Sequence, residues 1–209
     1  AVDPTDSQTV FLATELNNAG SSDWAGIFRS RDGGQAWEKV GEAGTYIDVE
    51  THPDAPGVVL ALGLLGLYRS ADHGTTWTKV LPHGGTSDSL LWALAWAPSD
   101  PGVVYVYRGD GLLLRSLDGG TTWGSLGKRL PRTLSQRPLA VDPLDPNTLV
   151  FEGESGPVRL TLGAGRMLLD QGLINNQMLV LYFDPNDPLR LLGGTLGAGL
   201  MEYRFQPGD

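Results

Sequence analysis

The chain of 209 residues contains no cysteine, which excludes disulfide bonds, thiolate metal sites and cysteine nucleophiles together. Its longest apolar run, residues 58–68, is too short to cross a bilayer. Basic residues are few: 15 Lys and Arg stand against 24 Asp and Glu, for a net charge of −9. This balance argues against a nucleic-acid or anionic-membrane surface, both of which select for positive charge. No segment has the periodicity of an amphipathic helix.

Turn-forming residues, by contrast, are abundant. The 29 glycines and 14 prolines accompany a normal hydrophobic content of 41%, which indicates many turns between short strands rather than disorder. Within this background the pattern Ser-x-Asp-x-Gly-x-x-Trp occurs three times, at residues 30–37, 70–77 and 116–123. We call each of these segments an octet. The octets start at residues 30, 70 and 116, so successive starts are 40 and 46 residues apart. This spacing indicates a repeat architecture.

Each octet lies between two strand-like apolar runs and predicts the turn of a β-hairpin, with glycine supplying the positive φ. The Asp carboxylate is suited to accept hydrogen bonds from its own turn, and the Trp to cap the hairpin. A calcium loop needs several converging oxygen ligands, and each octet offers one Asp, so a structural role is favoured. The residues with this predicted role are Ser30, Asp32, Gly34, Trp37, Ser70, Asp72, Gly74, Trp77, Ser116, Asp118, Gly120 and Trp123.

The octet resembles the Asp box, or BNR repeat. This repeat recurs in β-propellers of sialidases, xyloglucan-active glycoside hydrolases, sortilin-type receptors and photosystem II assembly factors. The resemblance implies a propeller fold and leaves function open, because these families share the turn and not the chemistry.

A second repeated feature marks where strands end. Proline-containing turns occur at Pro4, Pro53, Pro98, Pro143 and Pro185, and proline cannot occupy a central strand. Each repeat is then expected to hold four strands, as in a propeller blade. We therefore predict one all-β propeller domain of about five blades, approximately residues 1–44, 45–89, 90–136, 137–176 and 177–209.

The terminal repeats contain fewer strands than the middle ones. We expect a closed ring of five blades whose termini share one blade, with membership of a larger propeller or assembly as the alternative. Closure is favoured because it removes exposed sheet edges. The chain opens at Ala1 within a repeat, so a mature or trimmed form is expected.

Candidate binding residues are expected on the face opposite the octets, where the loops differ most between repeats. Trp24, after the long loop of the first repeat, could stack on a sugar or anchor a partner. The basic segment 128–137, with Arg129 and Arg132, could dock an acidic peptide or anionic group. The plainer alternatives are that Trp24 folds onto its own blade and that the basic segment is a solvated loop.

The central mouth offers Arg108, Asp110 and the carboxylate pair Glu152 and Glu154. Two carboxylates can serve glycoside hydrolysis, but one adjacent pair is weak evidence for catalysis. The three histidines are scattered, with neither metal-ligand spacing nor a serine nucleophile beside them. No metal and no cofactor is predicted. Arg29, Arg69 and Arg115 recur before the octet serine and are therefore expected to be structural, not a sialidase arginine triad.

The sequence thus predicts a non-catalytic binding or scaffold propeller that mediates protein–protein interaction or assembly. The alternative is a carbohydrate-active protein, either a lectin or a glycoside hydrolase. The expected partner is a protein or a glycan, not nucleic acid, and no membrane insertion is expected. The resemblance to Asp-box proteins, most of which are exported, implies a location outside the cytoplasm.

Overall fold

The computed structural model describes residues 1–15, 24–85, 90–130, 138–153, 156–169, 178–195 and 199–206. These residues form five antiparallel sheets, which we call blades 1 to 5. The strands in chain order are β1 (Val2–Asp3), β2 (Asp6–Thr14), β3 (Gly26–Ser30) and β4 (Glu38–Lys39); β5 (Tyr46–Thr51), β6 (Val59–Gly63), β7 (Gly66–Ser70) and β8 (Thr78–Pro82); β9 (Leu91–Trp96), β10 (Val104–Arg108), β11 (Leu112–Ser116) and β12 (Gly124–Arg129); β13 (Leu139–Val141), β14 (Thr148–Gly153), β15 (Gly156–Thr161) and β16 (Gly165–Leu168); and β17 (Met178–Asp184), β18 (Asp187–Thr195) and β19 (Gly199–Arg204).

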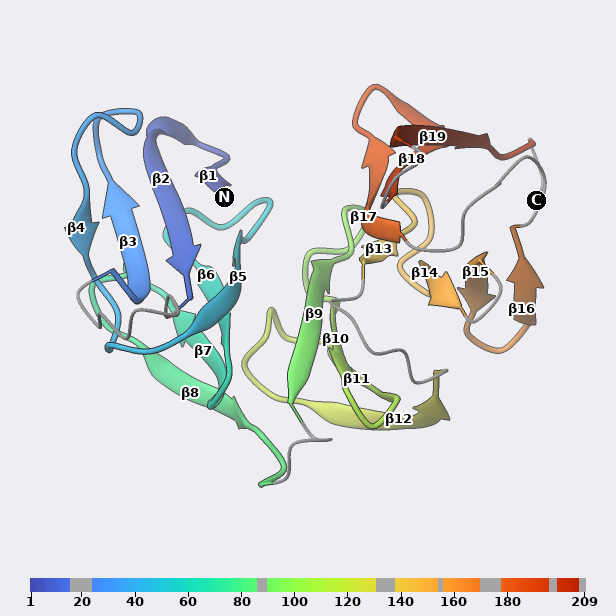
Figure 1. Ribbon diagram of the computed structural model, residues 1–209, viewed down its shortest axis with the longest axis horizontal. Coiled ribbons are helices and arrows are strands. Elements are labelled where there is room, and N and C mark those ends of the chain that lie inside the picture. The colour runs from blue at the N-terminus through green and yellow to red at the C-terminus, as the bar shows by residue number, and fades with distance from the viewer. Residues whose placement is uncertain are drawn as a thin grey trace.

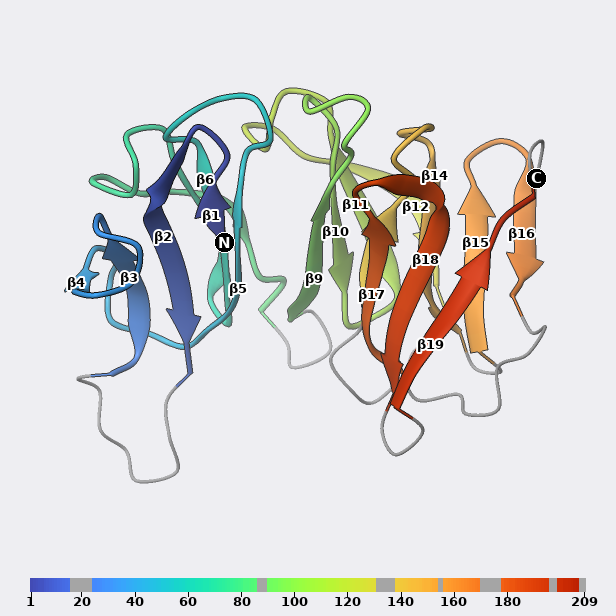
Figure 2. The same ribbon diagram turned by 90° about the horizontal axis from the view of Figure 1, so that it is seen from above.

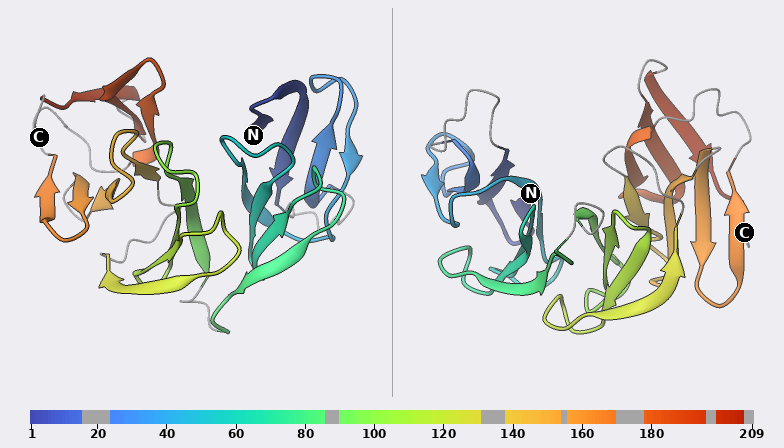
Figure 3. Two further views of the ribbon diagram at one scale, coloured as in Figure 1. Left: turned by 180° about the vertical axis from the view of Figure 1, so that it is seen from behind. Right: turned by 60° about the horizontal axis from the view of Figure 1, so that its bottom comes forward.

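In every blade, strands that follow one another in sequence pair with one another. Four blades have four strands, and blade 5 has three within the described residues. The blades succeed each other around a common centre, with blade 1 and blade 5 at the two ends of the arc (Figure 1; Figure 3, left). The predicted all-β propeller of about five blades is confirmed, and the described residues contain no helix and hence none that could span a membrane.

Separate apolar cores lie between successive blades. One core joins blades 1 and 2 through Phe11, Ile27 and Tyr68. The next three cores join blades 2 and 3, blades 3 and 4, and blades 4 and 5. The sheets of blades 2, 3 and 4 each contribute to two cores and are therefore apolar on both faces. Burial between neighbouring blades stabilises the arc at about 25 cal/mol per Å² of apolar surface.

The three octets fold into the same hydrogen-bonded turn. In the second octet, Ser70 Oγ accepts the Gly74 N–H at 2.8 Å and donates to Asp72 Oδ1 at 2.8 Å. Asp72 Oδ1 also accepts the Thr76 N–H at 2.8 Å, and Trp77 Nε1 donates to the Gly74 carbonyl at 2.9 Å. The first and third octets repeat this pattern.

Positive φ at two consecutive positions explains the glycines of the octet. The fourth residue has φ of 70°, 56° and 65° at Gly33, His73 and Gly119, and the fifth position is always glycine, also at positive φ. His73 is the one non-glycine residue of the described chain in this region, where a side chain is disfavoured.

The octets and the proline turns lie at the same end of the sheets (Figure 2). The N–H of the fourth octet residue joins the two sets, as when His73 N donates to the Gly57 carbonyl at 2.9 Å and Gly119 N to the Gly102 carbonyl at 2.9 Å. This end of the propeller is therefore a repeated, internally bonded surface.

The expectation that the two termini share one blade is wrong. The first strand, β1, pairs with β2 in blade 1, whereas β17 to β19 form blade 5. Apolar side chains on both end blades are exposed, among them Leu12 at 46% and Leu200 at 73%. The two end blades therefore do not close on one another as neighbouring blades do elsewhere in the arc.

Candidate functional site

Trp24, the predicted aromatic anchor, is 71% exposed. Its carbonyl accepts a hydrogen bond from Thr14 Oγ1, which ties its backbone to the end of β2. With this exposure the Trp24 side chain lies at the surface and is not folded onto its blade. Whether it binds a ligand stays a prediction, and residues 16–23 before it lie outside the described residues.

Arg108 and Asp110 bind each other. Arg108 Nε and Nη2 donate to the two carboxylate oxygens of Asp110 at 2.9 and 2.8 Å, and Asp110 Oδ1 also accepts the Leu112 N–H at 3.2 Å. The pair lies at the turn between β10 and β11. Its evident role is to close this turn, and its predicted role in binding stays untested.

The remaining predicted residues are only partly described. Glu152 is buried, and its Oε1 accepts the Met178 N–H at 2.9 Å, which joins blade 4 to blade 5. Arg129 belongs to β12, but its side chain lies outside the described part of the chain. Glu154 and Arg132 lie wholly outside the described residues. The carboxylate pair and the basic segment therefore stay predictions.

A cavity of about 300 Å³ lies at the centre of the arc. Strands β5, β9, β13 and β17, the first strands of blades 2 to 5, supply its walls. Its lining consists of Ile47, Asp48, Glu50, Trp92, Ala93, Leu94, Pro138, Leu139, Leu179, Val180, Leu181 and Tyr182. Two carboxylates, Asp48 and Glu50, are thus brought together in an otherwise largely apolar lining.

The geometry of β5 explains why both carboxylates point the same way. Asp48 and Glu50 are two residues apart and pair with Leu62 and Leu60 of β6, so they share one face of blade 2. An irregularity between Tyr46 and Asp48 shifts the register just before them. Both side chains are partly exposed, at the edge of the core between blades 2 and 3.

The pKa values of both carboxylic acids are raised. Burial raises the pKa of Glu50 to about 8, and the nearby Asp48 charge adds to this shift. Burial raises the pKa of Asp48 to about 6. The amino group of Ala1 lowers both values slightly, but this group itself donates to the Phe11 carbonyl at 2.9 Å. The Asp48 carboxylate accepts a hydrogen bond from the Val49 N–H, which lowers its pKa, and within the described residues neither carboxylate forms an ion pair with a Lys, Arg or His side chain.

The wall opposite the carboxylates is apolar and open to solvent. Leu179, Val180 and Tyr182 of β17 are 56%, 54% and 55% exposed, although they belong to an inner strand. An open cavity with apolar and aromatic walls and a few convergent polar groups is the usual form of a binding site. Perturbed carboxyl groups within it strengthen that assignment.

Chemically, the cavity suits a cationic group flanked by apolar surface. A cation beside Asp48 and Glu50 would offset the cost of burying their charges. No group of three or more His, Asp or Glu side chains that could hold a metal ion occurs in the described part of the chain.

Asp48 and Glu50 were not predicted from the sequence, because binding residues were expected in the variable loops and at the central mouth, whereas these two lie within strand β5. A signal was present: β5 reads Tyr-Ile-Asp-Val-Glu-Thr, in which two acids replace the apolar residues that an inner strand would place on one face.

Comparison with known proteins identifies the fold and not the family. No family model matches the chain, and no curated protein matches it in sequence. Solved structures do match. A crystal structure of an ancestral GH74 enzyme aligns with a TM-score of 0.70 and 16% identity, covering 92% of this chain and 26% of that one.

Two structures of YCF48 are also similar. The one bound to D1 peptide aligns with a TM-score of 0.58 and 16% identity, covering 94% of this chain and 62% of that chain. The one from Cyanidioschyzon merolae gives 0.60 and 15%, covering 96% and 68%. The present chain thus spans about a quarter of the GH74 enzyme and about two thirds of YCF48. At these identities the likeness shows a shared propeller fold alone.

Proposed function

We propose that this propeller is a non-catalytic binding module that docks a segment of a partner protein in its central cavity. A Lys or Arg side chain of the segment lies between Asp48 and Glu50, and apolar residues beside it contact Leu179, Val180 and Tyr182. The observation that carries the proposal is the pair of adjacent carboxylates without a cationic side-chain partner, facing an exposed apolar wall.

The energetics of the pair favour such a ligand. Ionised carboxylates withdrawn from water are costly when unpaired, and truncating one partner of a buried pair typically costs about 2–5 kcal/mol. A bound cation provides the missing counter-charge and lowers the raised pKa values of both acids. Binding at neutral pH is therefore expected to release protons, chiefly from Glu50.

The structural neighbours are consistent with this class of function. One of them is a propeller described as bound to a peptide. The net charge of −9 also favours a segment that carries basic residues. A location outside the cytoplasm, implied by the Asp-box resemblance, belongs to the same proposal.

The test is affinity capture from the native source with three baits, followed by cross-linking to place the contact. The baits are the wild type, the double variant Asp48→Asn/Glu50→Gln, and the double variant Arg129→Glu/Arg132→Glu. A protein held by the wild type and by the arginine variant, but lost with the carboxamide variant, supports the central cavity. Loss with the arginine variant alone would move the site to the basic segment.

A carbohydrate-active role is the second candidate, and it is favoured by two carboxylic acids, Asp48 and Glu50, that face one open cavity. Glycoside hydrolysis uses such a pair of carboxyl groups, and burial raises the pKa of both. Hydrolysis or binding of xyloglucan oligosaccharides that disappears in Glu50→Gln would support this candidate. Absence of both, with a retained protein partner, would contradict it.

A further inference from the structure

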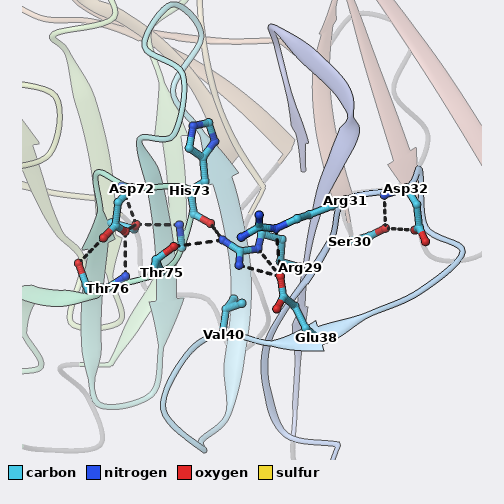
Figure 4. A network of polar contacts seen from close by, with 12 residues as sticks. Arg29, Ser30, Arg31, Asp32, Glu38, Val40, Asp72, His73, Thr75 and Thr76 are labelled. Carbon is cyan, nitrogen blue, oxygen red and sulfur yellow. Dashed lines mark hydrogen bonds and ion pairs between the residues drawn. The ribbon is translucent and has the colours of Figure 1, made fainter.

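Blades 1 and 2 present different surfaces at their two ends. At the octet end, polar side chains bind groups of the protein itself: Arg29 donates to the carbonyl of His73 and to the carboxylate of Glu38 (Figure 4). Arg31 donates to the same carboxylate at 3.2 Å. The connections between second and third strands lie at the opposite end, because successive antiparallel strands run in opposite directions. At that end blade 2 exposes apolar side chains.

The hairpin between β6 and β7 has a tip of two leucines. Gly63 pairs with Gly66 across the two strands, so the loop consists of Leu64 and Leu65 alone. Two-residue hairpin loops are usually built from Asn, Asp and Gly, and loops are usually polar. Here both leucines are exposed, Leu64 at 37% and Leu65 at 59%. The turn does not require this choice, and contiguous exposed apolar surface is typical of an interaction site.

The leucine tip lines a cavity of about 230 Å³, which we call the leucine pocket. Segment 42–45, which leads from blade 1 into β5, also lines it. The Leu64 N–H donates to the Thr45 carbonyl at 3.1 Å, so the tip and this segment are tied together. The leucine pocket shares no lining residue with the central cavity. It is therefore a second, separate site.

Two buried tyrosines, Tyr46 and Tyr68, complete the lining of the leucine pocket. Their rings pack edge to face, with centroids 5.7 Å apart. Gly63 leaves room for the Tyr46 ring, since an added Cβ would lie 3.1 Å from it. Both tyrosines belong to the core between blades 1 and 2, so the pocket is built on packed side chains. A preformed apolar and aromatic pocket of this kind suits a large apolar side chain of a partner.

Among the described residues that line the leucine pocket, Glu42 alone is charged. Its side chain is exposed and forms no ion pair with any residue that the structure describes. Burial raises the pKa of Tyr46 to about 12, and the charges of Tyr68 and Glu42 add to this shift, which places the Glu42 carboxylate near the Tyr46 phenol. A basic group beside the apolar side chain of the partner would therefore meet a complementary charge.

We propose that the leucine pocket binds a segment of a partner protein in which a large apolar residue stands next to Lys or Arg. The apolar side chain enters the pocket between Leu65 and the two tyrosines, and the basic side chain lies beside Glu42 at the surface. This arrangement is the reverse of that in the central cavity, where the cation enters and the apolar contacts lie beside it.

The test is a selection of random displayed peptides on immobilised Asp48→Asn/Glu50→Gln, in which the central cavity has lost its charge. Fluorescence anisotropy then gives the dissociation constants of the enriched peptides for this protein and for versions that also carry Leu65→Asp, Leu117→Asp or Glu42→Lys. Leu117 is the matched control, an exposed leucine (68%) in the third octet at the other end of the sheets. Amide hydrogen exchange of β6 and β7, with and without peptide, gives a readout that needs no further substitution.

We expect the enriched peptides to share a large apolar residue next to Lys or Arg. Leu65→Asp should weaken their binding roughly tenfold or more, whereas Leu117→Asp leaves it unchanged. Glu42→Lys should also weaken binding, and replacing the basic residue of the peptide with Glu should restore it. Amides at residues 63–66 should become protected by the bound peptide.

Several results would overturn the proposal. These are equal binding to the Leu65→Asp and Leu117→Asp proteins, no protection at residues 63–66, or a selection that enriches no peptide with an apolar and basic pair. If binding requires Leu65 but ignores Glu42→Lys, the basic residue is not recognised and the stated partner chemistry is wrong. Each of these results leaves the proposed role of the central cavity standing, because Asp48 and Glu50 are already replaced in every protein compared.

Discussion

The Nε of Arg69 donates a hydrogen bond of 3.0 Å to the carbonyl of Gly119, and this contact joins blade 2 to the octet of blade 3. Arg115 occupies the same position in blade 3, but its buried Nε has no partner in the described chain. Arg69→Gln is expected to lower the free energy of unfolding by about 1–3 kcal/mol, because it leaves a carbonyl unpaired. Arg115→Gln loses mainly its contact with the Tyr105 ring, about 0.5–1 kcal/mol. Urea denaturation of both variants checks the difference, and equal losses would contradict the assignment.

Replacing Gly120 with alanine tests why the fifth octet residue is glycine. An added Cβ would lie 2.9 Å from Leu60 Cδ1, on a backbone with φ of +81°. Gly127 has a similar φ of +63° with no atom within 4 Å. Gly127→Ala is expected to cost about 1–2 kcal/mol for the left-handed backbone alone, and Gly120→Ala a further 1–3 kcal/mol, roughly, for overpacking. Thermal unfolding of the pair separates the two effects, and a smaller loss at Gly120 would refute the packing explanation.

The octet aspartates predict loss of stability in acid. Hydrogen bonds from Thr76 and Ser70 lower the pKa of Asp72 to about 2, and those from Thr122 and Ser116 do the same for Asp118. The folded-state pKa of each carboxyl group lies below the ordinary value of 3.8. Each ionised carboxylate therefore adds its full contribution to the free energy of unfolding above about pH 4, and this contribution is lost as the pH falls through 2. Asp72→Asn/Asp118→Asn should therefore be less stable at pH 6 and show a flatter stability profile between pH 5 and 2. A parallel profile would exclude the hydrogen bonds as the cause.

For Glu50 we expect the opposite dependence of stability on pH. Its pKa is raised from 4.5 to about 8, so the folded protein binds the proton more tightly than the unfolded chain. This contribution is complete below pH 4.5 and is lost as the pH rises through 8. Glu50→Gln should accordingly be more stable than the wild type at pH 9, and the gain should shrink toward pH 5. Titration of the Glu50 carboxyl group by NMR would measure its pKa directly. An ordinary pKa at Glu50 would contradict this explanation of the pH dependence.

How much of this could be read from the sequence depends on whether the signal repeats. The octets and proline turns recur, and they were sufficient to predict the propeller and its blade number. Asp48 and Glu50 occur once, within a strand, and their proximity to β17 depends on how distant segments pack around the centre.

The most direct measurement is a selection of random peptides displayed on phage against the immobilised wild type, with counter-selection against Asp48→Asn/Glu50→Gln. The variant keeps the shape of the cavity and removes its charge. We expect the enriched peptides to share a Lys or Arg with apolar neighbours, and to release protons on binding in calorimetry at pH 7. Enrichment of peptides that bind the variant equally well, or that lack a basic residue, would contradict the central cavity as the binding site.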